Sequence, residues 1–302
     1  MKFAVHYYKS FRYFNQIDEV LFDYKGTEYI TEFIPDFLKQ EQRAIINIAN
    51  LNLEEIFEYL LVLQQKHENY AVQINYGTQR EWIPALEEMK IKYMFINYAN
   101  SMDQVYAYSQ YNITDMYICE ALGFRLKDLQ YLRKEKNIAF RIYPDIAQSE
   151  KYDIPDLAKF FVRPEGLDAY EQYVDTIEIY RCDNKISVVY EIYKQRQWSG
   201  YLEDLIIGFS KNFSIDNTLI LPTFDNVRVN CGKQCLAEGP CHYCYRVLGL
   251  SPLLEKNDLH IIRKKEPILS EEEQEKINHY IEDLKGMKDG QEIITDNMLF
   301  EH

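Results

Sequence analysis

The sequence lacks the motifs that mark several common enzyme chemistries. The first predicted strand continues into His6–Ser10 and not into the glycine-rich turn that binds dinucleotides. There is no Gly-x-Ser-x-Gly elbow, no phosphate-binding P-loop, no His-Glu-x-x-His zinc motif and no Ser-His-Asp order. Glycine itself is scarce, with 11 residues in a chain of 302. Hydrolysis by these routes and a dinucleotide-binding fold are therefore not supported.

Long apolar runs and an excess of basic residues are also missing. No window reaches the ~18 uncharged apolar residues that a membrane span requires. The first residues, Met1–Tyr8, contain no apolar run of export length. Lys and Arg number 34 against 48 Asp and Glu, which gives a net charge of −14 and argues against broad non-specific binding to nucleic acid. We expect a cytoplasmic protein with no membrane contact.

Tyrosine, in contrast, is abundant, with 26 tyrosines and 16 phenylalanines. Tyrosine combines a large apolar ring with a polar tip, and it is enriched where proteins associate. The composition is compatible with a homo-oligomer or an assembly partner. A coding bias toward Tyr, Asn, Ile and Lys is the alternative explanation.

Four cysteines lie within fourteen residues, in the pattern C-x3-C-x5-C-x2-C, and they are Cys231, Cys235, Cys241 and Cys244. Closely spaced thiolates are the ligands that soft and borderline metals prefer. Zinc is the leading interpretation, because four-cysteine sites with short knuckles are its usual structural home. A 4Fe–4S cluster takes the same ligands and is the alternative. Disulfides are less compatible with a long chain that has no export signal.

Short apolar runs alternate with segments of helical periodicity along the first 180 residues. Helices are predicted at Leu53–Lys66, with Asn52 as its N-cap, and over several other segments. The helices outside Leu53–Lys66 are Thr27–Gln40, Trp82–Met89, Met102–Gln110, Leu126–Lys134, Leu167–Tyr173 and Leu202–Phe209. The predicted strands are Phe3–Tyr7, Val20–Tyr24, Ala44–Ala49, Ala71–Asn75, Tyr93–Asn97, Asp115–Cys119, Ala139–Tyr143, Lys159–Val162 and Thr176–Tyr180.

This alternation predicts an α/β fold with a parallel sheet. The number of repeats favours a (β/α)8 TIM-like barrel over an open doubly wound sheet. We assign residues 1–210 to the barrel and 211–302 to a C-terminal metal-binding segment, helix and tail. Ile186–Tyr193 is predicted to be a strand hairpinned with Thr176–Tyr180. Ser270 and Glu273 form a capping box for the terminal helix.

In such a barrel, chemistry occurs where the strands end and the βα loops begin. Strand ends supply the candidate catalytic residues Glu120, Asp145, Arg163 and Glu165. A carboxylate there could act as a general base if burial raised its pKa, and a guanidinium beside a carboxylate could bind an anion. Each also has a structural explanation in a turn, a cap or a loop ion pair. The wider set of strand-end residues is His6, Asp23, Asn47, Asn75, Asn97 and Gln148.

The stretch from Thr114 to Glu120, with Arg163-Pro164-Glu165 and the later cysteines, resembles the collagenase-like peptidase family (U32). The resemblance spans about Ala44 to Cys244. It implies a TIM-like barrel with four cysteines that often hold an iron–sulfur cluster. It also implies hydroxylation of RNA bases or quinones, or proteolysis. The cysteines here are more compact than those of the family.

Two functions of different classes follow. The first is an enzyme that acts on RNA or another small polar substrate. The second is a non-catalytic structural or interaction protein with a zinc-stabilised barrel. A phage-encoded assembly component is one example of this class. A concave, charge-lined site at the strand ends would favour the enzyme. Aromatic side chains that fill this site, together with a large apolar surface patch, would favour the second function.

Overall fold

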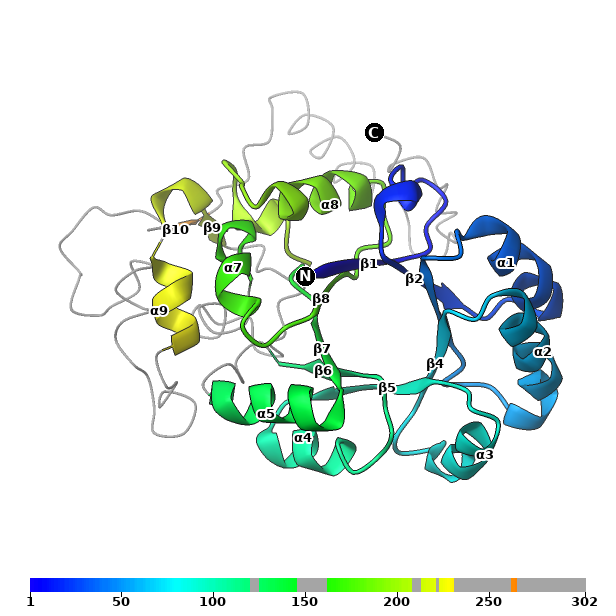
Figure 1. The fold of residues 1–302 in the computed structure, drawn as a ribbon. Helices are drawn as coiled ribbons and strands as arrows, with labels where there is room; N and C mark the ends of the chain where they lie inside the picture. The colour runs from blue at the N-terminus through cyan, green and yellow to red at the C-terminus, as the bar shows by residue number, and fades with distance from the viewer. Residues whose placement is uncertain (120–124, 146–161, 208–212, 221–222, 231–261, 265–302) are drawn as a thin grey trace, which may run out of the picture. The chain divides into compact units, whose positions relative to one another are not determined.

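Eight strands form a closed, all-parallel barrel in the computed structural model of the chain (Figure 1). Each strand pairs with the next, and β1 closes the ring against β8 through pairs such as Lys2 with Thr176. The strands are β1 (Lys2–His6), β2 (Glu19–Asp23), β3 (Arg43–Asn47), β4 (Tyr70–Ile74), β5 (Tyr93–Ala99), β6 (Asp115–Ile118), β7 (Ala139–Ile142) and β8 (Thr176–Ile179). The structure describes residues 1–119, 125–145, 162–207, 213–220, 223–230 and 262–264. The predicted barrel is confirmed, and the open sheet is wrong.

Helices surround the ring of strands (Figure 1). The longer ones are α2 (Leu53–Lys66), α5 (Leu126–Lys136) and α8 (Ile186–Gln195). The shorter α-helices are α1 (Ile34–Phe37), α3 (Ile83–Glu88), α4 (Met102–Tyr108), α7 (Leu167–Tyr170) and α9 (Phe224–Asn230). One π-helical turn, η2 (Tyr29–Phe33), precedes α1. The 3-10 turns are η1 (Phe14–Gln16), η3 (Arg80–Trp82), η5 (Pro164–Gly166), η6 (Leu202–Asp204) and η7 (Asn217–Leu219).

Local sequence signals explain where the best-predicted helices begin. The side chain of Asn52 accepts a hydrogen bond from the backbone N–H of Glu54, so it caps α2 as predicted. Ser101 caps α4 in the same way through Gln104 N–H. Each cap satisfies a backbone donor that the first turn of a helix leaves unpaired.

The sheet separates two apolar clusters. Its outer face packs against the helices and contains most of the buried apolar side chains, including Val20, Ile46 and Phe140. The inner face contributes a much smaller cluster, made of Ala4, Leu21, Ile45, Met94 and Tyr117. Because so few apolar residues fill the inside, polar and charged residues must complete it, and these residues form the candidate site.

One prediction about the later part of the barrel is wrong, and one is not tested. Ile186–Tyr193 is helical, within α8. Its buried residues Ile186, Val189, Tyr190 and Tyr193 recur at helical spacing, so the apparent alternation of β-branched residues was misleading. The predicted strand at Lys159–Val162 stays a prediction, although β7 pairs directly with β8 in the described barrel. Residues 159–161 themselves lie outside the described residues.

The chain divides into two compact units, Met1–Arg263 and Lys264–His302. β9 (Phe213–Ile215) belongs with β10 (Ile262–Lys264) to a two-stranded sheet. The predicted boundary between residues 210 and 211 stays a prediction, since residues 208–212 are outside the described part. Among the described helices, none is long and apolar enough to cross a membrane.

Candidate functional site

A network of charged side chains occupies the inside of the barrel, where branched apolar residues usually lie. The Arg141 guanidinium is fully buried on β7. Its Nη1 donates to Glu19 Oε2 at 2.5 Å and to Asp115 Oδ1 at 3.2 Å. Its Nη2 donates to Glu178 Oε2 at 2.9 Å. Four strands are therefore joined across the barrel axis by one side chain.

The buried network has one more carboxylate than guanidinium groups, so it is neutral only if a further proton is bound. Arg43 Nη1 lies 2.7 Å from Asp115 Oδ2, so two guanidinium groups face the three buried carboxylates of Glu19, Asp115 and Glu178. Lys2 reaches Glu19 at 3.4 Å, but its side chain is 60% exposed, and water screens its charge. A protonated imidazole next to Glu178 would balance the remaining negative charge.

His6 supplies that imidazole at the carboxyl end of β1. Its Nε2 lies 3.1 Å from Glu178 Oε1, and its side chain is 19% exposed while Glu178 is buried. Burial of the ring favours a lower pKa for His6, but the hydrogen bond and charge of Glu178, helped by Asp23 and Asp145, outweigh it and raise the pKa. Burial also acts against ionised Glu178, yet Arg141 and His6 lower the pKa of this carboxyl. The pair favours a protonated His6 beside an ionised Glu178.

Tyrosines surround this pair. Tyr117 donates its hydroxyl hydrogen to Glu178 Oε2 at 2.8 Å, and the Tyr117 hydroxyl oxygen accepts a hydrogen bond from Gln73 Nε2 at 2.5 Å. The ring of Tyr117 is stacked with that of Tyr143 at 5.0 Å, and Tyr98 is stacked with Tyr143 at 5.9 Å. Burial raises the pKa of both Tyr117 and Tyr143 well above the usual value of a tyrosine. Both tyrosines are therefore neutral hydrogen-bonding groups at physiological pH.

The rim of the barrel presents polar groups near His6. Tyr180, which is 45% exposed, makes an edge contact with His6 at 5.4 Å between ring centroids. Asn47 Nδ2 donates to Asp23 Oδ1 at 3.1 Å, and Asp23 is exposed. These residues end or follow β1, β2, β3 and β8, which are neighbours in the closed sheet. A substrate that reached His6 would thus meet a carboxylate, an amide and an aromatic edge.

The predicted candidate Asp145 lies close to this end of the barrel but is held by backbone. Its two carboxylate oxygens accept hydrogen bonds from the N–H groups of Tyr180 and Arg181 at 3.0 and 2.9 Å. Burial raises the pKa of Asp145 to about 6, although those amides lower it. Arg141, four positions earlier in the chain, contacts Glu178 at 2.9 Å. Asp145 anchors the end of β8.

Arg163 and Glu165 are brought together, as the sequence suggested, at the start of η5. Arg163 is 2% exposed, and its Nη2 lies 3.5 Å from Glu165 while its Nη1 lies 3.6 Å from Asp225. Glu165 Oε1 also accepts from Trp198 N–H and from Asn217 Nδ2. Both residues have structural partners that connect η5 with α9 and η7. Their catalytic role stays a prediction.

Two other strand-end residues shape turns. Asn75 Oδ1 accepts from the N–H groups of Gly77 and Thr78, and Asn97 Oδ1 accepts from Tyr76 N–H at 2.6 Å. Side chains of this type replace backbone partners in tight turns. They fix the loop after β4.

The remaining predicted site residues lie outside the described residues. These are Glu120, Gln148 and the four cysteines Cys231, Cys235, Cys241 and Cys244. In the part of the chain that is described, no group of three or more His, Cys, Asp or Glu side chains is placed to hold a metal ion. The four-cysteine site stays a prediction.

Sequence reasoning missed most of the buried network. His6 was among the strand-end candidates, but Glu178 and Tyr117 were not, because both lie within strands. A usable signal was present, since each of β2, β3, β6, β7 and β8 carries a charged residue at an inward position. A buried charge is costly unless it is paired, so several such strands predict a shared network.

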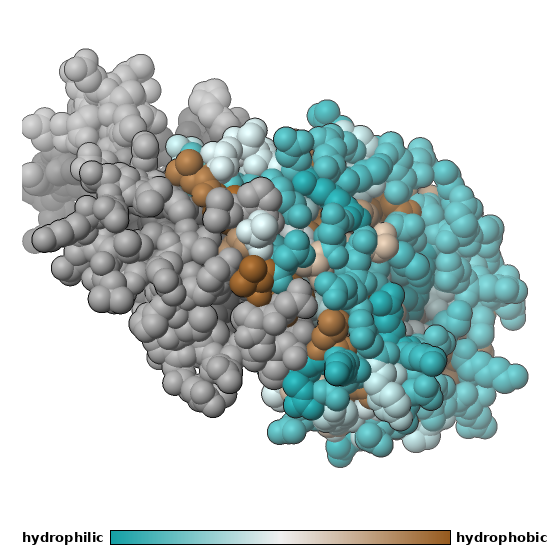
Figure 2. Space-filling model, turned by 60° about the vertical axis from the view of Figure 1, so that its left-hand side comes forward, coloured by the Kyte–Doolittle hydropathy of each residue, from teal (hydrophilic) through white to brown (hydrophobic). Residues whose placement is uncertain are grey.

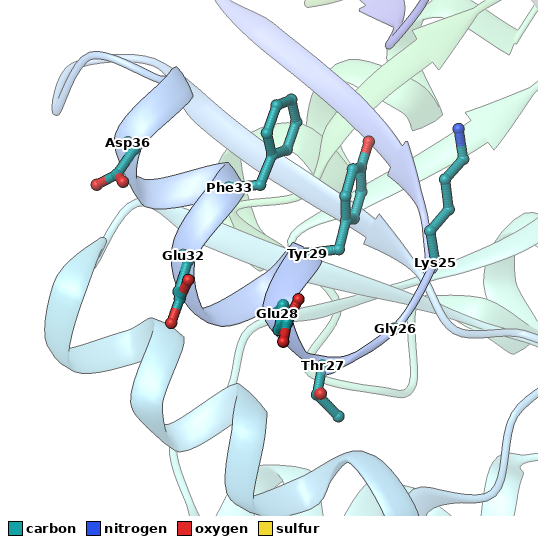
Figure 3. Close-up of a pocket in the computed structure, with 8 residues that line it drawn as sticks. All are labelled: Lys25, Gly26, Thr27, Glu28, Tyr29, Glu32, Phe33 and Asp36. Atoms are coloured by element: carbon teal, nitrogen blue, oxygen red, sulfur yellow. The ribbon is translucent and has the colours of Figure 1, made fainter.

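A separate groove of about 680 Å³ lies beside η2, after β2. In Figure 3, Lys25, Tyr29 and Phe33 extend toward one side, while Glu32 and Asp36 extend from the helix toward the other. The rings of Tyr29 and Phe33 are stacked at 4.8 Å. The groove offers exposed carboxylates and aromatic surface but no histidine or cysteine among its lining residues. It is a weaker candidate for proton transfer than the His6–Glu178 pair.

Comparisons with known proteins leave the family open. No protein-family model matches the chain, and no curated protein matches it significantly. The resemblance to the collagenase-like peptidase family therefore has no support beyond the barrel fold, and the function must be argued from the site.

Proposed function

We propose that this barrel is an enzyme that transfers a proton to or from a polar substrate at its carboxyl end, with His6 as the general acid–base group. The observation that supports this most directly is the contact of partly exposed His6 with fully buried Glu178 at 3.1 Å. A carboxylate behind an imidazole fixes its orientation and tautomer, and it stabilises the charged ring. His6 can then exchange a proton through its other nitrogen.

The surrounding network explains why His6 would hold a proton near neutral pH. Glu178 is ionised because Arg141 contacts it, and the buried charges leave one negative charge uncompensated. A group whose pKa lies close to the working pH is the most effective acid–base catalyst. In this proposal His6 starts protonated and acts as a general acid, while Arg141 positions Glu178 without touching the substrate.

The substrate class follows from the rim. Tyr143 and Tyr180 offer aromatic surface, and Asp23 with Asn47 offers hydrogen-bond acceptors and donors. Aromatic rings stack on bases and sugars, so RNA or another polar, ring-containing molecule suits this surface. An acidic chain binds an RNA through local contacts and not through its overall charge.

The cysteines complete the proposal. Cys231, Cys235, Cys241 and Cys244 provide four thiolates, a donor set that fits structural zinc and equally fits a 4Fe–4S cluster. A zinc ion would stabilise the C-terminal segment, whereas a cluster would supply electron transfer. The acid–base role of His6 depends on neither.

A non-catalytic structural or interaction role is the second candidate, and one observation favours it. The rings of Tyr98, Tyr117 and Tyr143 stack on one another and belong to or pack against the inner apolar cluster of the barrel. The other feature expected of such a protein, a large apolar surface patch, is less evident. On the face in Figure 2, the described surface is mainly hydrophilic, and hydrophobic residues form only small separate spots.

The two candidates differ in what His6 does. In an NMR titration of the full chain, the ring of His6 should titrate above 6.5 (its ordinary pKa), and Glu178→Gln should lower that value. The chain would then be incubated with RNA and with a set of polar metabolites, and products identified by mass spectrometry. His6→Asn should reduce product formation by about 100-fold or more.

The matched control is His67→Asn, because His67 is buried away from the charged network and its Nε2 lies 2.9 Å from Gln42 O. This variant should retain activity if it folds. An activity that His6→Asn leaves intact would reject the assignment. The absence of any turnover, together with an ordinary pKa for His6, would favour the non-catalytic role.

A further inference from the structure

A second pocket lies at the opposite end of the barrel, where β5, β6 and β7 begin. Its volume is about 370 Å³, and the segments that precede these three neighbouring strands form its walls. Three lysines line it: Lys90, Lys92 and Lys136. Asn112 and Asn137 lie among them. His6 ends β1 at the other face, so this pocket is separate from the proposed catalytic site and independent of it.

In the described part of the chain, the lysines of this pocket lack an acidic partner. Within the described residues, no ion pair involves Lys90, Lys92 or Lys136, although the chain contains 48 acidic side chains against 34 basic ones. The one acidic lining residue, Glu87, accepts a hydrogen bond from the Tyr93 hydroxyl at 2.8 Å. Three lysines and one glutamate leave the pocket with a net positive charge in a chain that is strongly negative overall.

The backbone at Lys90 is strained. Lys90 has φ of 58°, and Asn137 has φ of 54°. Ile91 N–H bonds to Leu86 O, and Lys90 N–H bonds to Glu87 O, which is the hydrogen-bond pattern that ends a helix with a left-handed residue. Glycine is the usual residue there, because any side chain in this region costs free energy. Asparagine tolerates the left-handed conformation because its short polar side chain can hydrogen-bond locally, whereas lysine lacks this compensation.

A simpler explanation covers only part of this arrangement. A lysine near a helix C-terminus interacts favourably with the helix dipole, and Lys136 ends α5. That interaction does not require lysine at the one position of the α3 cap where glycine is better. It also does not explain Lys92, which precedes β5 and lies on no helix. Strain at a pocket-lining lysine points to a function for its ammonium group.

We infer that this pocket binds the phosphate group of a small phosphorylated ligand. Ammonium groups are strong donors to phosphate oxygens, and the asparagine amides can add neutral hydrogen bonds. The volume lies within the range of small-molecule sites and accommodates a compound the size of a sugar phosphate or a nucleoside monophosphate. The exposed lysines make binding sensitive to salt.

Calorimetric titration of the full chain tests this inference with two probes, inorganic phosphate and adenosine 5′-monophosphate, at constant ionic strength with chloride as the reference anion. Both probes should bind. Equal affinities would show that the site recognises the phosphate group alone. Tighter binding of the nucleotide would show that its sugar or base also contributes to binding.

The decisive variant is Lys90→Gly. It removes one ammonium and also the backbone strain, so affinity should fall about tenfold while the melting temperature stays the same or rises. Lys136→Ala should weaken binding by a similar factor. Lys134→Ala is the matched control, because Lys134 also lies in the last turn of α5 but does not line the pocket.

Three results would overturn the inference. They are no binding of either probe at millimolar concentration, an affinity that Lys90→Gly leaves unchanged, and an equal loss in Lys134→Ala. An RNA oligonucleotide that bound far more tightly than the monophosphate, through the same lysines, would replace the small ligand by nucleic acid. A gain in stability without a loss of affinity would show that Lys90 is merely tolerated.

Discussion

The replacement Arg141→Met tests whether the charged network holds the barrel together. Arg141 is fully buried and contacts three carboxylates, those of Glu19, Asp115 and Glu178. Methionine fills similar space but leaves the carboxylates with Arg43, whose side chain is 12% exposed, as the remaining guanidinium of the described network. Removing one partner of a buried ion pair typically costs about 3–5 kcal/mol of the free energy of unfolding. We expect a loss of about that size at pH 7.

The loss should depend on pH in a defined direction. Burial favours protonation of Asp115, but Arg43 and Arg141 lower the pKa of this carboxyl to about 2, and the pKa of Glu178 is lowered as well. A lowered pKa contributes stability that is present above the unfolded value of about 4 and is lost as the pH falls through the folded value. Without Arg141 the buried carboxylates protonate more readily, so the difference between wild type and variant should shrink toward pH 3.

Urea denaturation followed by circular dichroism at pH 7 and near pH 3 measures this difference. Arg133→Met is the control, because Arg133 is 40% exposed in its pair with Asp175, and solvent reduces such a pair to about 1 kcal/mol or less. A loss below about 1 kcal/mol for Arg141→Met, or a loss that is the same at both pH values, would refute the view that Arg141 neutralises the network.

Three further predictions concern single residues. Asp145 has a folded pKa of about 6, above its unfolded value, so the wild type should lose stability as the pH rises from about 4 to about 6, and a denaturation series should show no such loss in Asp145→Asn. Asn52→Ala removes the cap of α2 and should lower the free energy of unfolding by about 1 kcal/mol, whereas Asn52→Asp should retain most of it. Cys235→Ser should reduce bound metal and lower the melting temperature, and elemental analysis of protein purified without oxygen should find one zinc, or else iron with acid-labile sulfide. An unchanged melting curve for Cys235→Ser would contradict a structural role of the cysteines.

Local signals account for the parts of the fold that were predicted well. Asn52 marks the start of α2, and the apolar spacing within Leu53–Lys66 gives the helix its bounds. The barrel strands are short and apolar because each is covered by helices outside and packed inside. The strand prediction for Ile186–Tyr193 was wrong because its β-branched residues, at mixed spacing, fit the periodicity of a strand as well as that of a helix. Only its position over the barrel, where Tyr190 contacts Phe3, selects the helix.

The candidate site could be predicted only in part. His6 stood out as a strand-end residue, but its partner Glu178 is 172 positions away and lies inside a strand. Nothing local connects the two, since closure of β1 against β8 alone brings them within hydrogen-bond distance. Arg163 and Glu165 are two residues apart, so their proximity was predictable, whereas their further contacts with Asp225 and Asn217 were not.

Short-range periodicity and spacing were sufficient to predict most of the alternating strands and helices, the barrel class and the cysteine pattern, but not the helix at Ile186–Tyr193. Which charges meet inside the barrel, and which lysines share a pocket at its other end, depends on how the sheet closes. A parallel sheet that closes on itself places inward side chains from distant strands around one axis, and burial there requires that their charges be paired.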